Sequence, residues 1–285
     1  MSGVASATIA PVLDKRAVAR AFSRAAPHYE SFARLQHTTG EQLLALLHKA
    51  TPQSLNTAAA ARQSVLLDLG AGTGFFARRL ASLSVGSPVV ELDLSAGMLQ
   101  QSQQQARQLG CKPPLALQAD FEALPMASQC CSLAFANLSL QWCVDLGKTL
   151  HDIHRVLRGG GVLAMNTLLD GSLSQLRQAS ASLGKHQHVN SFTTESALHA
   201  LVQDLPFDVI EWQVSEHRQC FQTTSALLRS INGIGAGNHM QGRAAGLMGK
   251  TRFAQFCNAL EQQRNANGEL ELGYRVLGLV LRAQA

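Results

Sequence analysis

The middle of the chain alternates short apolar runs with segments in which apolar residues recur every three or four positions. The short runs are typical of strands buried on both faces, and the recurring residues indicate amphipathic helices. We expect strands at 65–69, 89–92, 115–118, 132–136 and 162–168, and helices at 75–83, 95–109 and from about 146 to "RVLRGGG". Gly159 should end the last of these helices in a left-handed conformation. The alternation predicts a parallel sheet covered by helices on both faces.

Two helices are expected before this alternation. The first follows Asp14, a candidate N-cap, and stops at Pro27. The second is an amphipathic helix that contains Leu43, Leu44 and Leu47. Residues 1–13 are expected to form a tail, and "ATPQSLNTAAAARQS" is expected to form a linker.

The rhythm changes after Asp170. Helices are expected at 172–183, 193–203 and 223–233, and long strands in "FDVIEWQVSEHRQCF" and "ELELGYRVLGLVLR". Because strands return late in the chain, the helices are interpreted as insertions between strands of one sheet.

Composition narrows the class of protein. Of the 285 residues, 46% are hydrophobic and 15% are charged, which predicts a globular chain with a sizeable core. The net charge is +5 and the pI about 9.1, without a dense Lys/Arg run. We therefore expect an acidic partner or an anionic substrate and no nucleic acid. No apolar stretch approaches the roughly 18 residues of a membrane span, so no membrane association is expected.

The cysteines and the N-terminal sequence favour the cytoplasm. Six cysteines are scattered without a C-x-x-C pair, and we interpret them as reduced thiols. The start "MSGVASATIAPVLDKR" lacks the basic and apolar regions of a secretory signal.

The stretch "LLDLGAGTGFF" predicts a cofactor loop between a strand and a helix. Gly70, Gly72 and Gly74 let the backbone approach a ligand, and the following helix directs free N–H groups toward it. A dinucleotide loop needs its third glycine one residue later, to pack the helix below a pyrophosphate. Asp68 at the end of the strand suits a ligand with an ammonium group and repels a pyrophosphate. The loop therefore favours S-adenosylmethionine over NAD or FAD.

Two further acids extend this pattern. Asp93 ends the second strand, at about the distance along the chain where a carboxylate meets ribose hydroxyls. Asp120 and Phe121 follow the third strand and are expected at the amino group and the ring face of adenine. The alternative is that both acids only cap loops. The predicted cofactor set also includes Leu94, Met98 and Asn137.

Two other chemistries find little support. "HDIHR" offers His151 and His154 on a charged helix, without the further ligands of a metal site, so no metal is expected. No G-x-S-x-G elbow supports Ser-His-Asp catalysis.

These motifs resemble the class I methyltransferases over residues 65–168. The matching stretches occur in that family's order: "VLLDLGAGTG", "VVELDLSAGML", "ALQADFEALPM", "LAFANLSLQW" and "IHRVLRGGGVLAM". The resemblance implies an α/β fold with a doubly wound, Rossmann-like sheet of seven strands, the last of them antiparallel. It also implies S-adenosylmethionine as the cofactor.

A narrower resemblance extends over nearly the whole chain. "AFSRAAPHYESFARLQ", "NLSLQWC", "NTLLDGSL", "RSINGIGAGN" and "LGYRVLGLVL" are similar to the malonyl-[acyl-carrier protein] O-methyltransferases of biotin synthesis. That family methylates the free carboxylate of malonyl carrier protein, and the ester then primes pimeloyl synthesis. The implied partner is an acidic acyl-carrier protein that binds transiently.

The resemblance also suggests residues on the acceptor side. "RAAPHYESFARLQ" would close over the pocket as a lid, with the Tyr29 hydroxyl at the methyl-transfer site and Arg24 as an anion contact. Gln141 and Trp142 would line the substrate channel. Packing is the alternative for Tyr29 and Trp142, and a solvated helix face is the alternative for Arg24. The net charge of +5 suggests further carrier contacts at Arg229 and Arg243, which flank the glycine-rich "NGIGAGNHMQG", and ordinary solvated surface is the alternative for both.

The predicted organisation has three parts: a tail and helical lid (1–60), a cofactor-binding core (61–170), and a helical insertion with closing strands of the same domain (171–285). Two other functions remain open at this point. One is methylation of a small molecule such as a quinone precursor, which needs a base near the methyl group. The other is a methyltransferase-like assembly factor.

Overall fold

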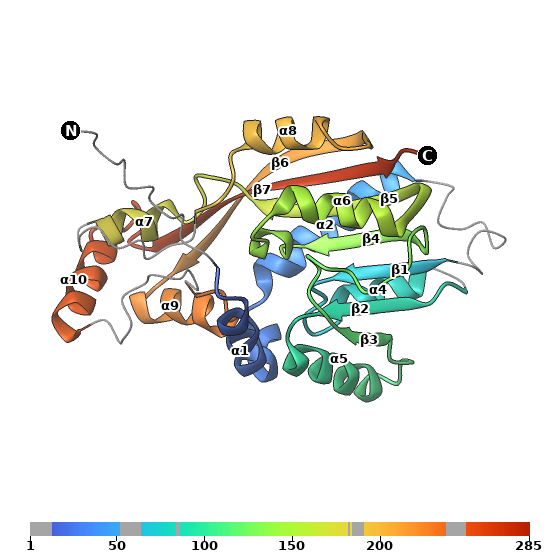
Figure 1. Cartoon of the computed structure of the whole chain (residues 1–285). Helices are drawn as coiled ribbons and strands as arrows, with labels where there is room; N and C mark the ends of the chain where they lie inside the picture. Colours follow the sequence, from blue (N-terminus) through green and yellow to red (C-terminus); the bar gives the residue numbers. More distant parts are fainter. Residues whose placement is uncertain (1–12, 52–63, 84–85, 182, 184–190, 238–248) are drawn as a thin grey trace, which may run out of the picture.

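A computed structural model describes residues 13–51, 64–83, 86–181, 183, 191–237 and 249–285. At its centre lies a seven-stranded sheet in the order β3-β2-β1-β4-β5-β7-β6 (Figure 1). The strands are β1 (Val65–Leu69), β2 (Val89–Asp93), β3 (Leu115–Gln118), β4 (Cys131–Asn137), β5 (Leu157–Leu168), β6 (Phe207–Phe221) and β7 (Leu270–Ala283). β1 to β5 are parallel, and β7 runs antiparallel to both of its neighbours, β5 and β6. The predicted fold class, including the antiparallel last strand, is confirmed.

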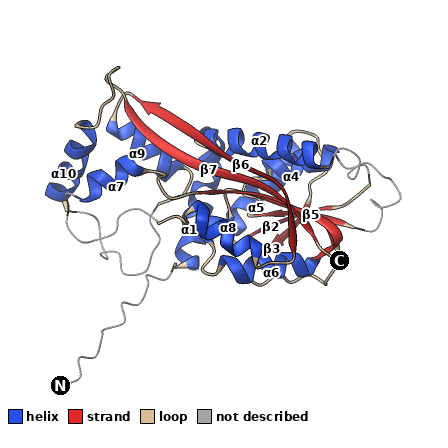
Figure 2. Ribbon diagram, turned by 90° about the horizontal axis from the view of Figure 1, so that it is seen from above, coloured by secondary structure: helices blue, strands red, loops and turns tan. Residues whose placement is uncertain are grey.

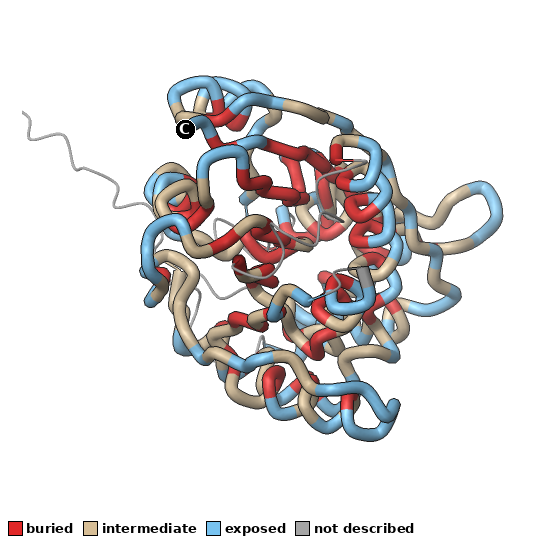
Figure 3. Tube along the Cα trace, turned by 90° about the vertical axis from the view of Figure 1, so that its right-hand side faces the viewer, coloured by how far each residue is buried: buried red, intermediate tan, exposed pale blue. Residues whose placement is uncertain are grey.

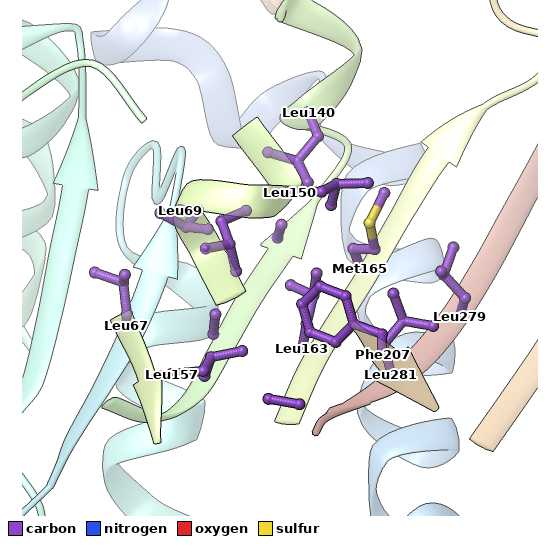
Figure 4. Close-up of a cluster of buried hydrophobic side chains, with 14 of the residues drawn as sticks. Leu67, Leu69, Leu140, Leu150, Leu157, Leu163, Met165, Phe207, Leu279 and Leu281 are labelled. Carbon is purple, nitrogen blue, oxygen red and sulfur yellow. The ribbon is translucent and has the colours of Figure 1, made fainter. Parts of the chain in front are cut away.

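Successive residues of the central strands enter two separate hydrophobic clusters. Leu67 and Leu69 of β1 pack with α6 (Leu146–Val156) and α8 (Glu195–Gln203) on one face (Figure 4). Leu66 packs with α2 (Arg34–Ala50) and α4 (Phe75–Leu83) on the other. Each fully buried leucine contributes about 1.5–3 kcal/mol, and Figure 3 shows the buried positions, in red, gathered in the middle of the molecule. The apolar runs of the sequence reflect this burial on both faces.

The strands β6 and β7 are the longest and pair from Phe207↔Ala283 to Phe221↔Leu270. Their outer part extends beyond the central strands and carries a further cluster built on Leu270, Leu272 and Val276 (Figure 2). The helices around that cluster are α7 (Ser174–Ala181), α9 (Thr224–Gly233) and α10 (Lys250–Glu261). The 171–285 part thus adds strands to the same sheet and a second core beside it.

The N-terminal helices lie at the carboxyl ends of the parallel strands. α1 (Lys15–Ala25) begins at Asp14, whose side chain accepts the Ala17 N–H at 2.9 Å, and it packs on α5 (Ala96–Gln108). A short 3-10 helix, η1 (Ala26–Ser31), then joins α1 to α2. The expected N-cap is confirmed, although the chain stays helical past Pro27 because proline fits the first turn of η1.

Two other expectations need correction. Gly159 does not cap α6: the helix ends at Val156, β5 begins directly at Leu157, and the left-handed conformation falls on Gly160 (φ 75°). The helix α10 was not expected, although Phe256 and Leu260 are buried one turn apart. The expected tail and linker lie mostly outside the described residues.

Candidate active site

The three glycines of the loop after β1 have different surroundings. All adopt positive φ, with values of 69°, 56° and 73° for Gly70, Gly72 and Gly74. A Cβ atom on Gly70 would meet Ser139, and one on Gly74 would meet Ser102. A Cβ on Gly72 would meet no atom within 4 Å, because this glycine faces a cavity at the ends of the strands. Packing therefore requires the outer two glycines, and the middle one leaves room for a ligand.

Asp93 holds the loop and also lines this cavity. Its Oδ2 accepts the Gly72 N–H at 2.9 Å, and its Oδ1 accepts the Ser95 N–H at 2.7 Å. Burial raises the pKa of Asp93 to about 6, although these two N–H groups favour the charged form. Each carboxylate oxygen has a further lone pair. The side chain can therefore cap the loop and accept hydroxyl groups of a ligand at once.

Asp68 lies below the loop and is only 2% exposed. Its Oδ2 has no hydrogen-bond partner among the described residues. Burial raises the pKa of Asp68 well above its usual value, and the nearby Glu91 and Asp93 raise it further. Three carboxyl groups therefore gather under one loop without a cation for Asp68, an arrangement that suits a positively charged ligand.

Asp120 and Phe121 line the opposite wall of the cavity. Asp120 accepts the Glu122 N–H at 3.0 Å, so it caps its loop, and it also pairs with Lys15 of α1 at 2.5 Å. Lys15 contacts Glu122 as well. The first residue of α1 is thereby joined to the loop after β3.

Two further contacts join the N-terminal segment to the cofactor loops. The hydroxyls of Ser23 and Ser95 lie 2.7 Å apart, where α1 crosses the start of α5. Glu30 of η1 accepts a hydrogen bond from Thr73 in the glycine loop and lies 2.8 Å from His37 Nε2. The N-terminal segment therefore covers the cavity and contacts three of its loops.

Asn137 ends β4 inside a polar network. Its Nδ2 donates to the Gln36 carbonyl at 2.9 Å, and its Oδ1 accepts from Thr39 at 3.1 Å and Asn166 at 2.8 Å. Asn166 also accepts the N–H of Leu138, which has a positive φ of 48°. Strained residues of this kind are concentrated at functional sites, and Leu138 stands in the wall between two cavities.

The first cavity combines backbone, acidic and apolar groups in its lining, as small-molecule sites do, and is named the cofactor cavity here. A second cavity, the acceptor chamber, adjoins it and shares Phe22, Tyr29, Leu138 and Trp142. The Phe22 and Trp142 rings meet edge to face at 5.6 Å. Most of the remaining lining is apolar, from Leu35, Leu168, Leu173, Leu176, Phe192, Ile231 and Ile234. Gln36, Gln141 and Tyr274 add polar groups.

The structure brings most of the predicted site residues to the cofactor cavity: Tyr29, Gly70, Gly72, Asp93, Leu94, Met98, Asp120, Phe121, Asn137 and Trp142. Asp68 and Gly74 are not part of its lining, and Gln141 lies in the acceptor chamber. Arg24 lines neither cavity but an outer groove, together with His28. Arg229 is exposed on α9, and Arg243 lies outside the described residues.

Sequence reasoning missed several lining residues: Leu13, Lys15, Val18, Ala19, Phe22, Leu138 and Ser139 in the cofactor cavity, and Gln36 in the acceptor chamber. Those on α1 have the helical spacing of a buried face, which was visible in the sequence. Nothing in the sequence showed which loop that face would cover.

Comparison with known proteins identifies the family. The model of the "Methyltransferase domain" family matches residues 67–165. The malonyl-[acyl-carrier protein] O-methyltransferase of Pectobacterium atrosepticum is 37% identical over 94% of this chain and 97% of its own length. The chain belongs to the malonyl-[acyl-carrier protein] O-methyltransferases. The enzyme of the same name from Yersinia pestis is 36% identical over 95% of this chain and 92% of its own length.

Solved structures agree on the fold of this methyltransferase. The crystal structure of a Bacillus halodurans protein, assigned there to the methyltransferases, superposes with a TM-score of 0.61 at 13% identity. It covers 86% of this chain and all of that one. At this identity the likeness supports the fold alone.

The methyltransferase uses S-adenosylmethionine, as its family does. The residues present fit that cofactor, because the open cradle at Gly72 and the unpartnered Asp68 oxygen suit its backbone contacts and its positive charge. The described residues contain no group of three His, Cys, Asp or Glu side chains arranged to hold a metal ion.

Proposed function

We propose that the protein transfers the methyl group of S-adenosylmethionine to the free carboxylate of a malonyl acyl-carrier protein, giving the methyl ester that primes pimeloyl synthesis for biotin. The observation that carries this proposal is the acceptor chamber. Of the described residues that line it, none is Asp, Glu, His or Lys, so this part of the lining offers no general base. A carboxylate is already ionised at neutral pH and needs none, whereas a phenolic acceptor must lose a proton.

We assign the cofactor residues from their places around the cofactor cavity. Asp93 would accept hydrogen bonds from the ribose hydroxyls. Asp120 and Phe121 would contact the adenine, and Lys15, which pairs with Asp120, lines the cavity beside them. Gly72 would lie against the methionyl part, and Asp68 would balance its ammonium group from below the loop. Leu94 and Met98 supply apolar contacts, and Asn137 holds the strand end in place.

The cofactor supplies a methyl group on a positively charged sulfur. The carboxylate oxygen forms the new bond to carbon, the carbon–sulfur pair of electrons goes to sulfur, and no proton moves. The protein therefore has to align the two ligands and exclude water. Phe22, Tyr29, Leu138 and Trp142, which line both cavities, would lie between the two ligands.

The carrier protein is the proposed partner, since the relatives are named for it. Arg24 and His28 lie on the groove between the N-terminal segment and α9, next to the chamber. Gly237 lines both the groove and the chamber, so an arm carrying the acyl group could enter there. We further propose that the carrier is acidic and binds transiently at this groove. A cytoplasmic location is also part of the proposal. The helices of the described segments include none with the length and hydrophobicity to cross a bilayer.

The experiment is incubation of the protein with S-adenosylmethionine, labelled in its methyl group, and malonyl carrier protein, followed by intact mass measurement. We expect one methyl group on the malonyl chain, removable by mild base as an ester is. Acetyl carrier protein, which has no free carboxylate, is the control and should stay unlabelled. Methylation of a phenolic quinone precursor instead, or cofactor binding without turnover on any acceptor, would contradict the proposal and favour the alternatives.

A further inference from the structure

Gln36 was not expected at the site, yet it lines the acceptor chamber beside Tyr29 and Gln141. Its Oε1 atom is buried and has no hydrogen-bond partner among the described residues. Leaving a buried polar atom without a partner is unfavourable for the folded protein. Because Gln36 also lines the chamber, a ligand there could become the partner of its terminal amide.

The backbone of Gln36 is fixed, whereas its terminal amide can turn. The Gln36 carbonyl accepts the Asn137 Nδ2–H at 2.9 Å, which ties α2 to the end of β4. The torsion of a terminal amide has a broad, two-fold profile. Rotation about this torsion lets the amide turn Nε2, which carries two N–H groups, toward an anion in the chamber.

Two other neutral donors face the same chamber. Gln141 Oε1 accepts the Leu168 N–H at 3.4 Å, which leaves the two N–H groups of Gln141 Nε2 for a ligand. Tyr29 adds a hydroxyl, and burial raises its pKa well above the usual value, so the hydroxyl keeps its proton.

The described lining of the chamber contains no charged side chain. Lys15 lines the cofactor cavity and not the chamber, and Asp120 and Glu122 already neutralise it. A buried carboxylate without a cation is strongly disfavoured. A carboxylate in this chamber would therefore depend on the positive charge that the cofactor brings to the shared wall.

We infer that Gln36, together with Tyr29 and Gln141, receives the free carboxylate of the substrate through neutral hydrogen bonds, in a chamber whose described lining holds no cation. The inference rests on the proposed function. Transfer converts an anion and a cation into two neutral products, so charge disappears on the way to the transition state. A fixed arginine or lysine would stabilise the starting carboxylate more than the transition state and would slow the reaction.

Substitutions at Gln36 test this, with the exposed Gln42 of the same helix as the matched control. Gln36→Met removes the donor and should lower kcat/KM for malonyl carrier protein about ten- to a hundred-fold. Gln36→Glu adds a like charge and should lower it further. Gln36→Lys should lower KM and kcat together, a split that a packing role does not produce. The same changes at Gln42 should alter these constants by less than two-fold.

Cofactor affinity is measured on every variant by calorimetry and should stay within two-fold of the parent. If the parent methylates malonyl carrier protein and the Gln36 variants match the Gln42 variants, the inference is wrong and the proposed function stands. If the parent does not methylate it, the proposed function itself fails.

A binding experiment on the unmodified protein gives a result even where a variant fails to fold. Affinity for malonyl carrier protein is measured with S-adenosylhomocysteine bound and with an analogue that has an ammonium group in place of the sulfonium. We expect at least ten-fold tighter binding with the cationic analogue and no such difference for acetyl carrier protein. Equal affinity in the two complexes would overturn the inference, because it would mean that the protein itself supplies the countercharge.

Discussion

The cofactor cavity and the acceptor chamber share four residues of one wall but differ in charge. Asp93 and Asp120 line the first, and Asp68 lies buried beneath its loop. The described lining of the second is free of charged side chains. The acids match a positively charged ligand. The chamber, in our inference, receives an anion through neutral donors, and its described lining holds no cation. The difference indicates that the two ligands balance each other's charge when both are bound.

The acids also have an energetic consequence for the empty protein. Burial raises the pKa values of Asp68, Glu91 and Asp93, so their charged forms are disfavoured until a cation arrives. The described lining of the acceptor chamber contains no acidic side chain of this kind. Removing charge should therefore change cofactor binding and stability on one side of the shared wall, and removing hydrogen bonds should change turnover on the other.

The largest effect is expected for Asp93→Ala. It should weaken S-adenosylmethionine binding by about 1.5–3 kcal/mol, the scale of hydrogen bonds to a charged group, while the fold stays intact. Calorimetry measures the loss. Glu91→Gln removes a charge from the same strand, but its side chain bonds Ser102 and does not line the cavity, so it should weaken binding less than Asp93→Ala. Unchanged affinity in Asp93→Ala would remove this residue from the ribose site.

Lowering the pH should reproduce part of that loss. The pKa of Asp93 is raised to about 6, so its carboxylate is charged above pH 6 and takes up a proton below it. Cofactor affinity should be flat above about pH 7 and fall about ten-fold between pH 7 and pH 5, which corresponds to about 1.4 kcal/mol. In Asp93→Asn the decline should be absent. A parent affinity that is constant down to pH 5 would contradict the assignment.

On the acceptor side, Tyr29→Phe should lower kcat by about ten-fold and leave cofactor affinity unchanged, because it removes one hydrogen bond to a charged group. The other tyrosine of the chain, Tyr274, also lines the chamber but donates to Gln219 at 3.3 Å. Tyr274→Phe should therefore retain most of the activity. Equal kcat in Tyr29→Phe and the parent would return Tyr29 to a packing role.

The buried acid below the loop should lower stability in exchange for affinity. Because the pKa of Asp68 is raised in the folded protein, stability falls as the pH rises from the unfolded pKa through the folded one. Asp68→Asn should then raise the free energy of unfolding of the cofactor-free protein by about 0.5–2 kcal/mol at pH 7, with a smaller gain at pH 4. Thermal melting measures this, and calorimetry should show weaker cofactor binding. A lower melting temperature at pH 7 would mean that Asp68 stabilises the fold by itself.

The smallest effect concerns the outer groove. Arg24→Gln should lower kcat/KM for malonyl carrier protein only a few-fold, since an exposed ion pair contributes about 0.2–1 kcal/mol. The same ratio should fall as salt rises past about 0.1 M, whereas activity on malonyl-CoA should vary less. Arg229 is exposed on α9 but does not line the groove, so Arg229→Gln is a matched variant. Equal salt dependence for both substrates would mean that the protein does not recognise the carrier through its surface charge.

The sequence predicted the sheet well because burial on both faces leaves continuous apolar runs, as in Val65–Leu69. It also located the acids of the cofactor cavity, since residues at the carboxyl ends of neighbouring parallel strands must meet there. Lys15 and Gln36 could not be found in the same way. Lys15 pairs with an acid 105 positions away, and Gln36 reaches the site only through the packing of α2 on the sheet. Neither position has a local pattern that distinguishes it from an exposed helix face.

The long pair of strands β6 and β7 has a consequence for how such an enzyme can evolve. Their outer part and the helices α7 and α9 provide the far wall of the acceptor chamber, on a hydrophobic cluster of its own. The cofactor loops rest on the central strands and on different clusters. Mutations in the outer cluster can therefore reshape the chamber for a new acyl chain while the ancestral ability to bind the cofactor is inherited unchanged.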